Sequence, residues 1–434
     1  MKKLLFLLTV VLFAACDNDE NLVTYQVNEP VMMTEAEFRS SVNVTTTSQR
    51  IENYGKICFY NGYLYISEPG EGIHIIDNRN PSSPAQVGFI ELLGNADIAV
   101  KNDLLYADAL IDLVWFDITN PAQPELTGRL ENVFPEAVPM AENNYAYDYS
   151  NVYTVDGKRK GVLVGWTLAQ RVTPAESYSN ETGWWNFWGG RNDGLMFAEA
   201  ATPSANKSSS GVNGSMSRFA LYDKYLYCVI NYQMQIFDLS TEKPEKVSGE
   251  DLYIGNVETI FSYKDNMFLG MPTGMSIYSV KDPTRPERCS TITHVLGCDP
   301  VVVDNDLAYV TVHSGNFCGQ NNDELFIVDV KDVYQPRQLV SFTMVNPKGL
   351  GIDSEKQTLF LCDDGLKVFK IGDNPQTLIS NQLAHIQGMD GFDLIPYDNV
   401  LMMIADDGLY QYDYSDIQSL KKLSVIPVYK NENQ

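Results

Sequence analysis

One unit recurs about every 41 residues in this sequence, and this repeat limits the folds open to the chain more than any other feature. Leu113–Leu130, LVWFDITNPAQPELTGRL, is its clearest copy: an alternating apolar run ends at an Asp, the chain turns at two prolines, and a second alternating run follows. Alternation with a period of two predicts strands that bury one face, and Asp and Pro are typical turn residues. The residue that leads the turn in each copy is Asp77, Asp117, Asp238, Ser279, Asp329, Lys370 or Asp413.

Four short strands in each unit of about 41 residues predict a β-propeller, because a single blade cannot bury both faces until it packs between two neighbours. The units predict an all-β fold, a propeller of eight blades of four antiparallel strands over residues 51–430, with seven blades as the alternative if one unit is split. Asp117 and Asp238 lie 121 residues apart. We assign this interval to one blade-like unit, Pro135–Leu168, followed by an insertion at about 169–213 that ends in a Ser/Gly-rich stretch.

The first residues are typical of an exported protein. Met1–Ala15 has two lysines and an unbroken apolar run, which predicts a secretion signal too short to span a membrane. The sequence FAAC that ends at Cys16 resembles the lipobox of bacterial lipoproteins, which implies that Cys16 carries lipid; plain secretion is the alternative. The following DNDE is similar to the export signal of Bacteroidetes-type lipoproteins and implies a lipid anchor on the outer face of the outer membrane. We expect residues 16–50 to be a tether, with Phe38–Val44 able to pair with a blade edge.

The charge of the chain excludes some partners. The sequence has 31 basic and 56 acidic residues, a formal net charge of −25. Nucleic acid and anionic lipid headgroups would be repelled by such a chain. The charge is compatible with a solvated surface, a basic partner or a divalent cation, and we expect a monomeric propeller that touches the membrane only through its lipid.

The repeated hairpins also carry a family resemblance. LVWFDITNP and its copies resemble the LVIVD repeat, and the likeness extends over nearly all of Ile51–Val428, including the sequence GSMSRF at Gly214–Phe219. The resemblance implies a propeller lipoprotein. It brings no activity and no catalytic residues.

Motifs of known catalytic chemistry are missing from the sequence. There is no HExxH, GxSxG, P-loop or dinucleotide-binding fingerprint. His74, His294, His313 and His385 are scattered and lack metal-ligand spacing, so we interpret them as ordinary strand or loop histidines. We therefore expect no catalytic residue, no metal site and no cofactor, with structural Ca²⁺ as the one exception. Cys298 and Cys318 flank one long hairpin loop and are a candidate disulfide.

Two groups of residues are candidates for binding. The loops on one face of a propeller surround its channel, and in this sequence those loops are rich in carboxylates. They predict a negative face that binds Ca²⁺ or a cationic partner. The alternative is that these Asp and Glu residues are ordinary turn residues. Trp184, Trp185, Phe187 and Trp188 lie together in the insertion, where rings can stack on sugars, anchor a protein or form a local core. The candidate acidic residues are Asp108, Asp112, Glu258, Asp299, Asp363, Asp390 and Asp406, with Glu68, Glu71, Asp97, Asp364 and Asp407 beside them.

Two classes of function follow from these features. The first is a non-enzymatic surface module that binds a glycan or a protein through the channel face and the tryptophan-rich insertion. The alternative is a propeller-type glycan hydrolase or lyase that uses two carboxylates of the acidic face as acid and base. Because no nucleophile, base or metal set is recognisable, we favour the binding module.

Overall fold

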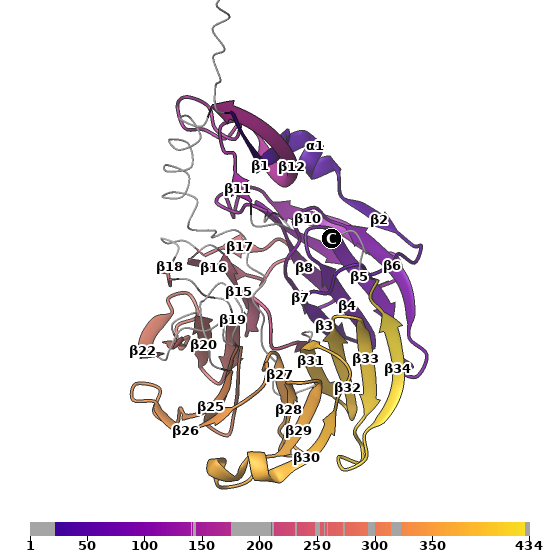
Figure 1. The fold of residues 1–434 in the computed structure, drawn as a ribbon, viewed down its shortest axis with the longest axis vertical. Helices are drawn as coiled ribbons and strands as arrows, with labels where there is room; N and C mark the ends of the chain where they lie inside the picture. The colour runs from indigo at the N-terminus through magenta and orange to yellow at the C-terminus, as the bar shows by residue number, and fades with distance from the viewer. Residues whose placement is uncertain are drawn as a thin grey trace, which may run out of the picture.

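The computed structural model describes residues 22–139, 141, 145–174, 210, 212–230, 232–247, 252–255, 257, 259–271, 274–293, 300–313 and 323–429. β-Strands make up nearly all of the regular secondary structure of these residues, which otherwise includes one short α-helix and two short 3-10 helices. Figure 1 shows four-stranded sheets set around a common centre, as the repeat predicted. The described part of the chain contains no helix long and apolar enough to cross a membrane.

Seven antiparallel sheets with four consecutive strands form the blades of a ring, numbered here in chain order. Blade 1 contains β3 (Ile57–Tyr60), β4 (Tyr63–Glu68), β5 (Gly72–Asp77) and β6 (Ala85–Glu91). Blade 2 contains β7 (Ile98–Lys101), β8 (Leu104–Ala109), β9 (Asp112–Asp117) and β10 (Glu125–Leu130). Blade 3 contains β14 (Phe219–Tyr222), β15 (Tyr225–Ile230), β16 (Gln233–Asp238) and β17 (Glu245–Lys246), and β18 (Leu252–Tyr253) also pairs with β16.

The other blades repeat this order. Blade 4 contains β19 (Thr259–Tyr263), β20 (Asn266–Met271), β21 (Gly274–Ser279) and β22 (Glu287–Thr293). Blade 5 contains β23 (Val301–Asp304), β24 (Leu307–Val312), β25 (Glu324–Asp329) and β26 (Arg337–Thr343). Blade 6 contains β27 (Leu350–Asp353), β28 (Thr358–Cys362), β29 (Leu366–Lys370) and β30 (Gln382–Ile386), with the short 3-10 helices η1 (Pro375–Thr377) and η2 (Ile379–Asn381) before β30. Blade 7 contains β31 (Gly391–Tyr397), β32 (Val400–Ala405), β33 (Gly408–Asp413) and β34 (Lys421–Pro427).

The ring closes on itself. The first strands of neighbouring blades, β3, β7, β14, β19, β23, β27 and β31, contact one another in that order, and β31 returns to β3. A parallel bridge between Ile51 and Val428, with a 2.7 Å bond from Tyr429 N to Ile51 O, joins the two ends of the predicted propeller. The segment before blade 1 therefore pairs with the segment after blade 7, which closes the ring.

The described chain forms eight sheets, as many as the units predicted from the sequence. Seven of these sheets make the ring, and the eighth, from the predicted unit Pro135–Leu168, is a three-stranded sheet outside it. In that sheet β12 (Val162–Pro174) pairs with β1 (Leu22–Met33), and β11 (Ala146–Tyr147) pairs with the other edge of β1. The unit does not become a blade because its one long strand finds its partner in the N-terminal segment.

The segment predicted as a tether is ordered from Leu22 onward. It forms β1, the helix α1 (Glu35–Ser40), capped by Thr34, and β2 (Asn43–Thr45), which adds to the edge of β6. The predicted pairing of Phe38–Val44 with a blade edge is confirmed for Asn43 and Val44, which pair with β6. Phe38 instead lies on α1, and its ring is buried against the cores of blades 1 and 2. From Leu22 onward the predicted tether thus forms strands and a helix, because β1 has a partner, β12, about 140 residues away in the sequence.

The core lies between neighbouring blades. The third residue of each blade's second strand is a buried aromatic residue in six of the seven blades. Buried rings at one repeated position fill the gap between twisted sheets, which is why the repeat yields a closed ring. These six residues are Tyr65, Tyr106, Tyr227, Phe268, Tyr309 and Phe360.

Candidate functional site

The centre of the propeller is occupied by the chain itself. β13 (Val212–Asn213) pairs antiparallel with β3, the innermost strand of blade 1, through Val212 opposite Phe59 and Asn213 opposite Cys58. Ser210 forms a bridge with Lys101 at the end of β7. We call Ser210 and Val212–Arg218 the plug, because this segment enters the space that the inner strands surround.

The plug is bonded to several blades at once. Ser215 donates from its N–H (2.7 Å) and its hydroxyl (2.9 Å) to Asp393 of blade 7, and its Oγ accepts from Leu350 N of blade 6 at 2.8 Å. Ser217 Oγ donates to Asp97 before blade 2 at 2.7 Å, and its carbonyl accepts from Ile260 N of blade 4 at 3.2 Å. The sequence GSMSRF therefore fills the channel between these blades, and a ligand cannot occupy the channel where the plug lies.

The predicted acidic face is largely neutralised by the chain's own cations. Asp112 accepts from Arg39 at 3.0 Å and from Arg129 at 2.8 Å. Asp363 accepts from Lys367 at 2.6 Å and from the backbone of Val345 and Asn346. The charges of Asp112 and Asp363 thus hold parts of the chain together, and a role for them in docking stays a prediction.

Two other predicted acidic residues, Asp390 and Asp406, also have partners within the chain. Asp390 binds Lys348 with both oxygens at 2.7 Å, and Asp406 accepts from Asp390 N at 3.4 Å. Several predicted residues lie outside the described part of the chain. They are the acidic residues Glu258 and Asp299, the lipidation and disulfide candidates Cys16, Cys298 and Cys318, the histidine His294, and the aromatic cluster Trp184, Trp185, Phe187 and Trp188. His385 bonds to Asp364 O, and the side chains of Cys58, Cys228 and Cys362 are fully buried in blade strands.

Asp108 is buried beside the plug. Its Oδ1 accepts from Ala96 N and Asp97 N, each at 2.8 Å, and from Asn95 Nδ2 at 3.0 Å. Burial, assisted by the negative charge of Asp97, raises the pKa of Asp108 to about 7 despite these bonds. The side chain therefore titrates near neutral pH inside the protein.

This raised pKa predicts a pH-dependent effect of Asp108→Asn. A carboxyl whose pKa is raised on folding contributes stability that is complete below its unfolded pKa, near 3.9, and is lost as the pH rises through its folded pKa. Relative to the wild type, Asp108→Asn should therefore gain up to about 1.4 kcal/mol per pH unit between about pH 4 and pH 7, and then level off. Urea unfolding of both proteins at pH 5, 6, 7 and 8 measures this; a constant difference would show that Asp108 is ionised throughout.

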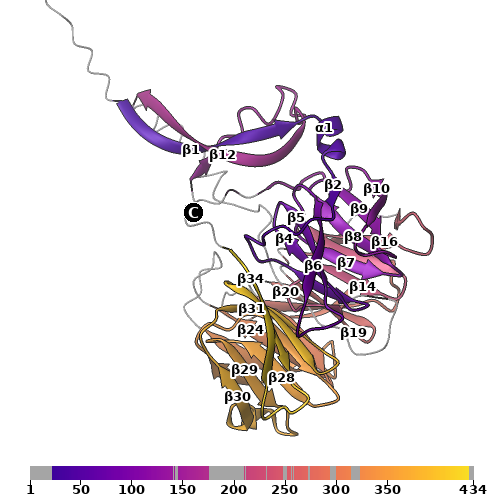
Figure 2. The same ribbon diagram turned by 90° about the vertical axis from the view of Figure 1, so that its right-hand side faces the viewer.

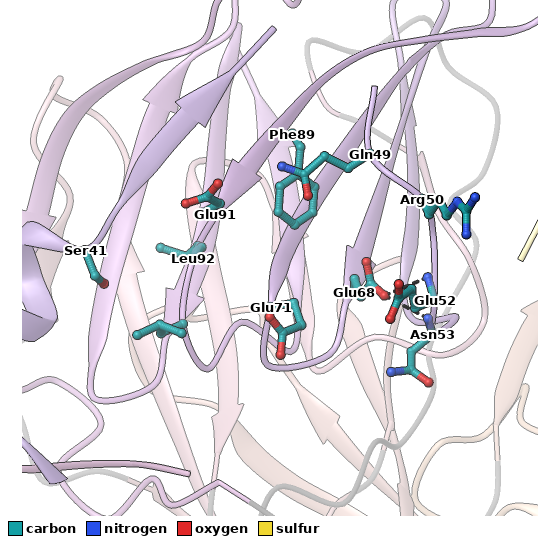
Figure 3. A pocket seen from close by; sticks show the side chains of 11 residues that line it. Ser41, Gln49, Arg50, Glu52, Asn53, Glu68, Glu71, Phe89, Glu91 and Leu92 are labelled. Carbon is teal, nitrogen blue, oxygen red and sulfur yellow. Dashed lines mark hydrogen bonds between the residues drawn. The ribbon is translucent and has the colours of Figure 1, made fainter. Parts of the chain in front are cut away.

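A cavity of about 760 Å³ lies over blade 1 (Figure 3). Its roof includes the strap, Ser48–Asn53, which crosses blade 1 between β2 and β3. We call it the strap cavity. It is lined by Ser41, Gln49, Arg50, Glu52, Asn53, Glu68, Glu71, Phe89, Glu91, Leu92 and Leu93.

Two of the carboxylates that line the strap cavity, Glu71 and Glu91, lie just before the start of β5 and at the end of β6. Gly72 pairs with Glu91, and Leu92 N donates to Glu71 O at 2.9 Å, so Glu71 and Glu91 lie on neighbouring chains. Glu71 is exposed and Glu91 is half-buried, and the Phe89 ring lies in the same wall (Figure 3). The cavity therefore offers hydrogen-bond acceptors next to an apolar surface.

Glu68 holds the strap in place. Its Oε1 accepts from Glu52 N and Asn53 N, both at 2.8 Å, and its Oε2 accepts from His74 Nε2 at 2.5 Å. Burial opposes ionisation of Glu68, but the bonds from His74 and the strap outweigh it and lower the pKa of Glu68. His74, buried in β5, is thus a structural histidine, as its strand pattern indicated.

Sequence reasoning missed most of the strap cavity. Glu68 and Glu71 were among the acidic residues of that face, but Glu52, Asn53 and Glu91 were not candidates. Glu52 belongs to a segment without a strand pattern, and its position over blade 1 depends on long-range bonds to Glu68. Within the described ranges, no group of three or more His, Cys, Asp or Glu is placed to hold a metal ion.

The comparisons with known proteins agree with this architecture. The model of the LVIVD repeat matches residues 55–90 and 94–131, which are blades 1 and 2. No curated protein matches the sequence. Among solved structures, a putative 6-phosphogluconolactonase from Bacteroides uniformis is similar with 9% identity and a TM-score of 0.48, over 83% of this chain and 93% of the other.

Two further solved structures have comparable similarity. AztD from Citrobacter koseri has 10% identity and a TM-score of 0.41, over 87% of this chain and 96% of the other. The dihydro-heme d1 dehydrogenase NirN has 11% identity and a TM-score of 0.48, over 88% of this chain and 68% of the other. At these values they carry no argument about function. The matched repeats and the closed ring of four-stranded blades show that this chain is a β-propeller that contains LVIVD repeats.

Proposed function

We propose that this chain is a non-enzymatic binding module that captures a glycan in the strap cavity, anchored to the outer membrane by lipid on Cys16. The observation that carries the proposal is the strap cavity itself: about 760 Å³ of open space with polar walls, next to a channel that the plug fills. Cavities of roughly 300–1,000 Å³ suit small ligands. This size favours a short oligosaccharide over a folded protein partner.

The walls match the chemistry of a sugar. Glu52, Glu71 and Glu91 present carboxylates, and Gln49 and Asn53 present amides. Carboxylates accept charge-assisted hydrogen bonds from hydroxyl groups, which are stronger than bonds between neutral groups. A neutral glycan offers many hydroxyl donors and carries no charge that the acidic walls would repel.

A glycan array tests this proposal with the full-length protein in detergent. Glu71→Gln combined with Glu91→Gln should weaken binding at least about tenfold, because each lost charge-assisted bond is worth roughly 1.5–3 kcal/mol. Glu125→Gln is the matched control, since Glu125 is an exposed carboxylate on the outer strand of blade 2. Equal binding by all three proteins would contradict the strap cavity as the site.

The same array can test the other candidates. A variant with Trp184, Trp185 and Trp188 changed to Ala should bind as the wild type does if the strap cavity acts alone, and should lose binding if the insertion takes part. The alternative function, a glycan hydrolase or lyase, needs two carboxylates roughly 5–10 Å apart about the bond that breaks. Release of shorter products from a bound glycan would support that alternative and overturn the non-enzymatic proposal.

A further inference from the structure

The sheet outside the ring forms a projecting arm. Figure 2 shows β1 and β12 as a ribbon that leaves the propeller beyond α1. The third strand, β11, pairs only with Val27 and Asn28 of β1. The outer part of the arm, Leu22–Gln26 paired with Gln170–Pro174, therefore has two strands, and we call it the arm tip.

The arm tip carries no acidic residue. Its residues, LVTYQ and QRVTP, include no Asp or Glu, although the whole sequence has 56 acidic residues. Its one cation, Arg171, bonds to Glu29 at 2.8 Å and to Asp148 at 2.5 Å. The arm tip is therefore nearly neutral on a strongly acidic protein.

The arm tip also exposes aliphatic side chains to solvent. Leu22 is 59% exposed and Val172 is 60% exposed. An isolated two-stranded ribbon is only marginally stable in water. Apolar side chains on a neutral ribbon suit contact with a lipid surface, where the acidic parts of the chain would be repelled.

The sequence places a lipid anchor close to this surface. Five residues lie between Cys16 and Leu22, and the six steps from one Cα atom to the other span at most about 20 Å in a fully extended chain. This step rests on the proposed lipidation of Cys16. With lipid on Cys16, Leu22 lies within about 20 Å of the anchored atom.

We infer that the arm tip docks on the lipid surface, with Leu22 and Val172 in the headgroup region, and that the arm is a spacer between membrane and propeller. β1 has 12 residues, and at about 3.3 Å per residue it spans about 40 Å. The paired arm is stiffer than the predicted tether, so it fixes the orientation of the strap cavity relative to the membrane as well as its distance.

Photo-crosslinking tests the contact with the lipidated full-length protein in vesicles of phosphatidylcholine, which has no net charge. Val172→p-benzoylphenylalanine and, separately, Leu22→p-benzoylphenylalanine should form lipid adducts at least about five times more often than Tyr334→p-benzoylphenylalanine. Tyr334, 64% exposed between β25 and β26, is the control. Two labelled sites in the arm tip guard against a local folding defect at either one.

Three results would overturn either the docking of the arm tip or the lipidation of Cys16, and they distinguish between the two. Equal adduct yields at all sites, with the protein bound to vesicles, would overturn docking and leave the lipid anchor intact. Crosslinks from the arm tip to a second copy of the chain in place of lipid would overturn it as well. If the wild type floats with vesicles no better than Cys16→Ser, the proposed lipidation has failed, independently of the arm.

Discussion

Replacing Asp112 with alanine is expected to lower the free energy of unfolding by about 3 kcal/mol. Asp112 is fully buried at the start of β9 and accepts from Arg39, Arg129 and Asn132 N at 3.0, 2.8 and 2.8 Å. Removing one partner of a buried ion pair costs about 3–5 kcal/mol, because the other charge stays buried without compensation. The expected loss is at the low end because Arg39 keeps Glu35 as a partner.

Urea unfolding at pH 7 measures this loss, and Asp390→Ala is the matched control. Asp390 is about half exposed and pairs with Lys348 on the same face, so its removal should cost at most about 1 kcal/mol. Similar losses for the two variants would mean that Asp112 is not the buried centre of this network. Unchanged stability together with lost binding would restore Asp112 as a ligand-binding residue.

The second large effect is expected from Gly214→Val in the plug. A Cβ atom at Gly214 would lie 1.9 Å from Asp393 Oδ2, and Asp393 is itself held by the N–H and hydroxyl of Ser215. Forcing extra atoms into a packed site usually costs about 1–3 kcal/mol. Because the substitution also strains bonds between the plug and blade 7, we expect about 3 kcal/mol, at the top of that range.

Gly165→Val provides the comparison for this substitution. Gly165 lies in β12 opposite Val31, and nothing lies within 4 Å of the position of its Cβ. Its substitution should change the free energy of unfolding by less than about 0.5 kcal/mol. If both variants unfold at the same urea concentration, the plug does not pack against Asp393 as the structure has it.

The repeat made the propeller predictable because its signal is local. Each blade is a run of neighbouring strands, and the buried aromatic residue of the second strand returns once in nearly every unit. β1 was not predictable by the same means. LVTYQVNEPVMM alternates only weakly, and its strand partner, Val162–Pro174, lies far away in the chain.

The functional surface was harder to predict for a related reason. The sequence identified many carboxylates on one face but could not pair them with cations from distant parts of the chain, as in Asp390 with Lys348 or Asp112 with Arg39. The plug is a run of small polar residues, which resembles a loop. Its burial becomes evident only when the closed ring brings Asp97 and Asp393 to either side of it.

The central claim is that the chain fills its own channel, which leaves the strap cavity over blade 1 as the proposed binding site. Amide hydrogen exchange of the full-length protein tests it most directly, in peptides that cover residues 212–219. The N–H groups of Gly214, Ser215 and Arg218 bond to Ile57 O, Asp393 and Asp97. These peptides should exchange as slowly as those of the inner strand β3, because buried hydrogen-bonded amides exchange only when the structure opens. Exchange within seconds, as in an exposed loop, would contradict the claim and would make the channel a candidate binding site again.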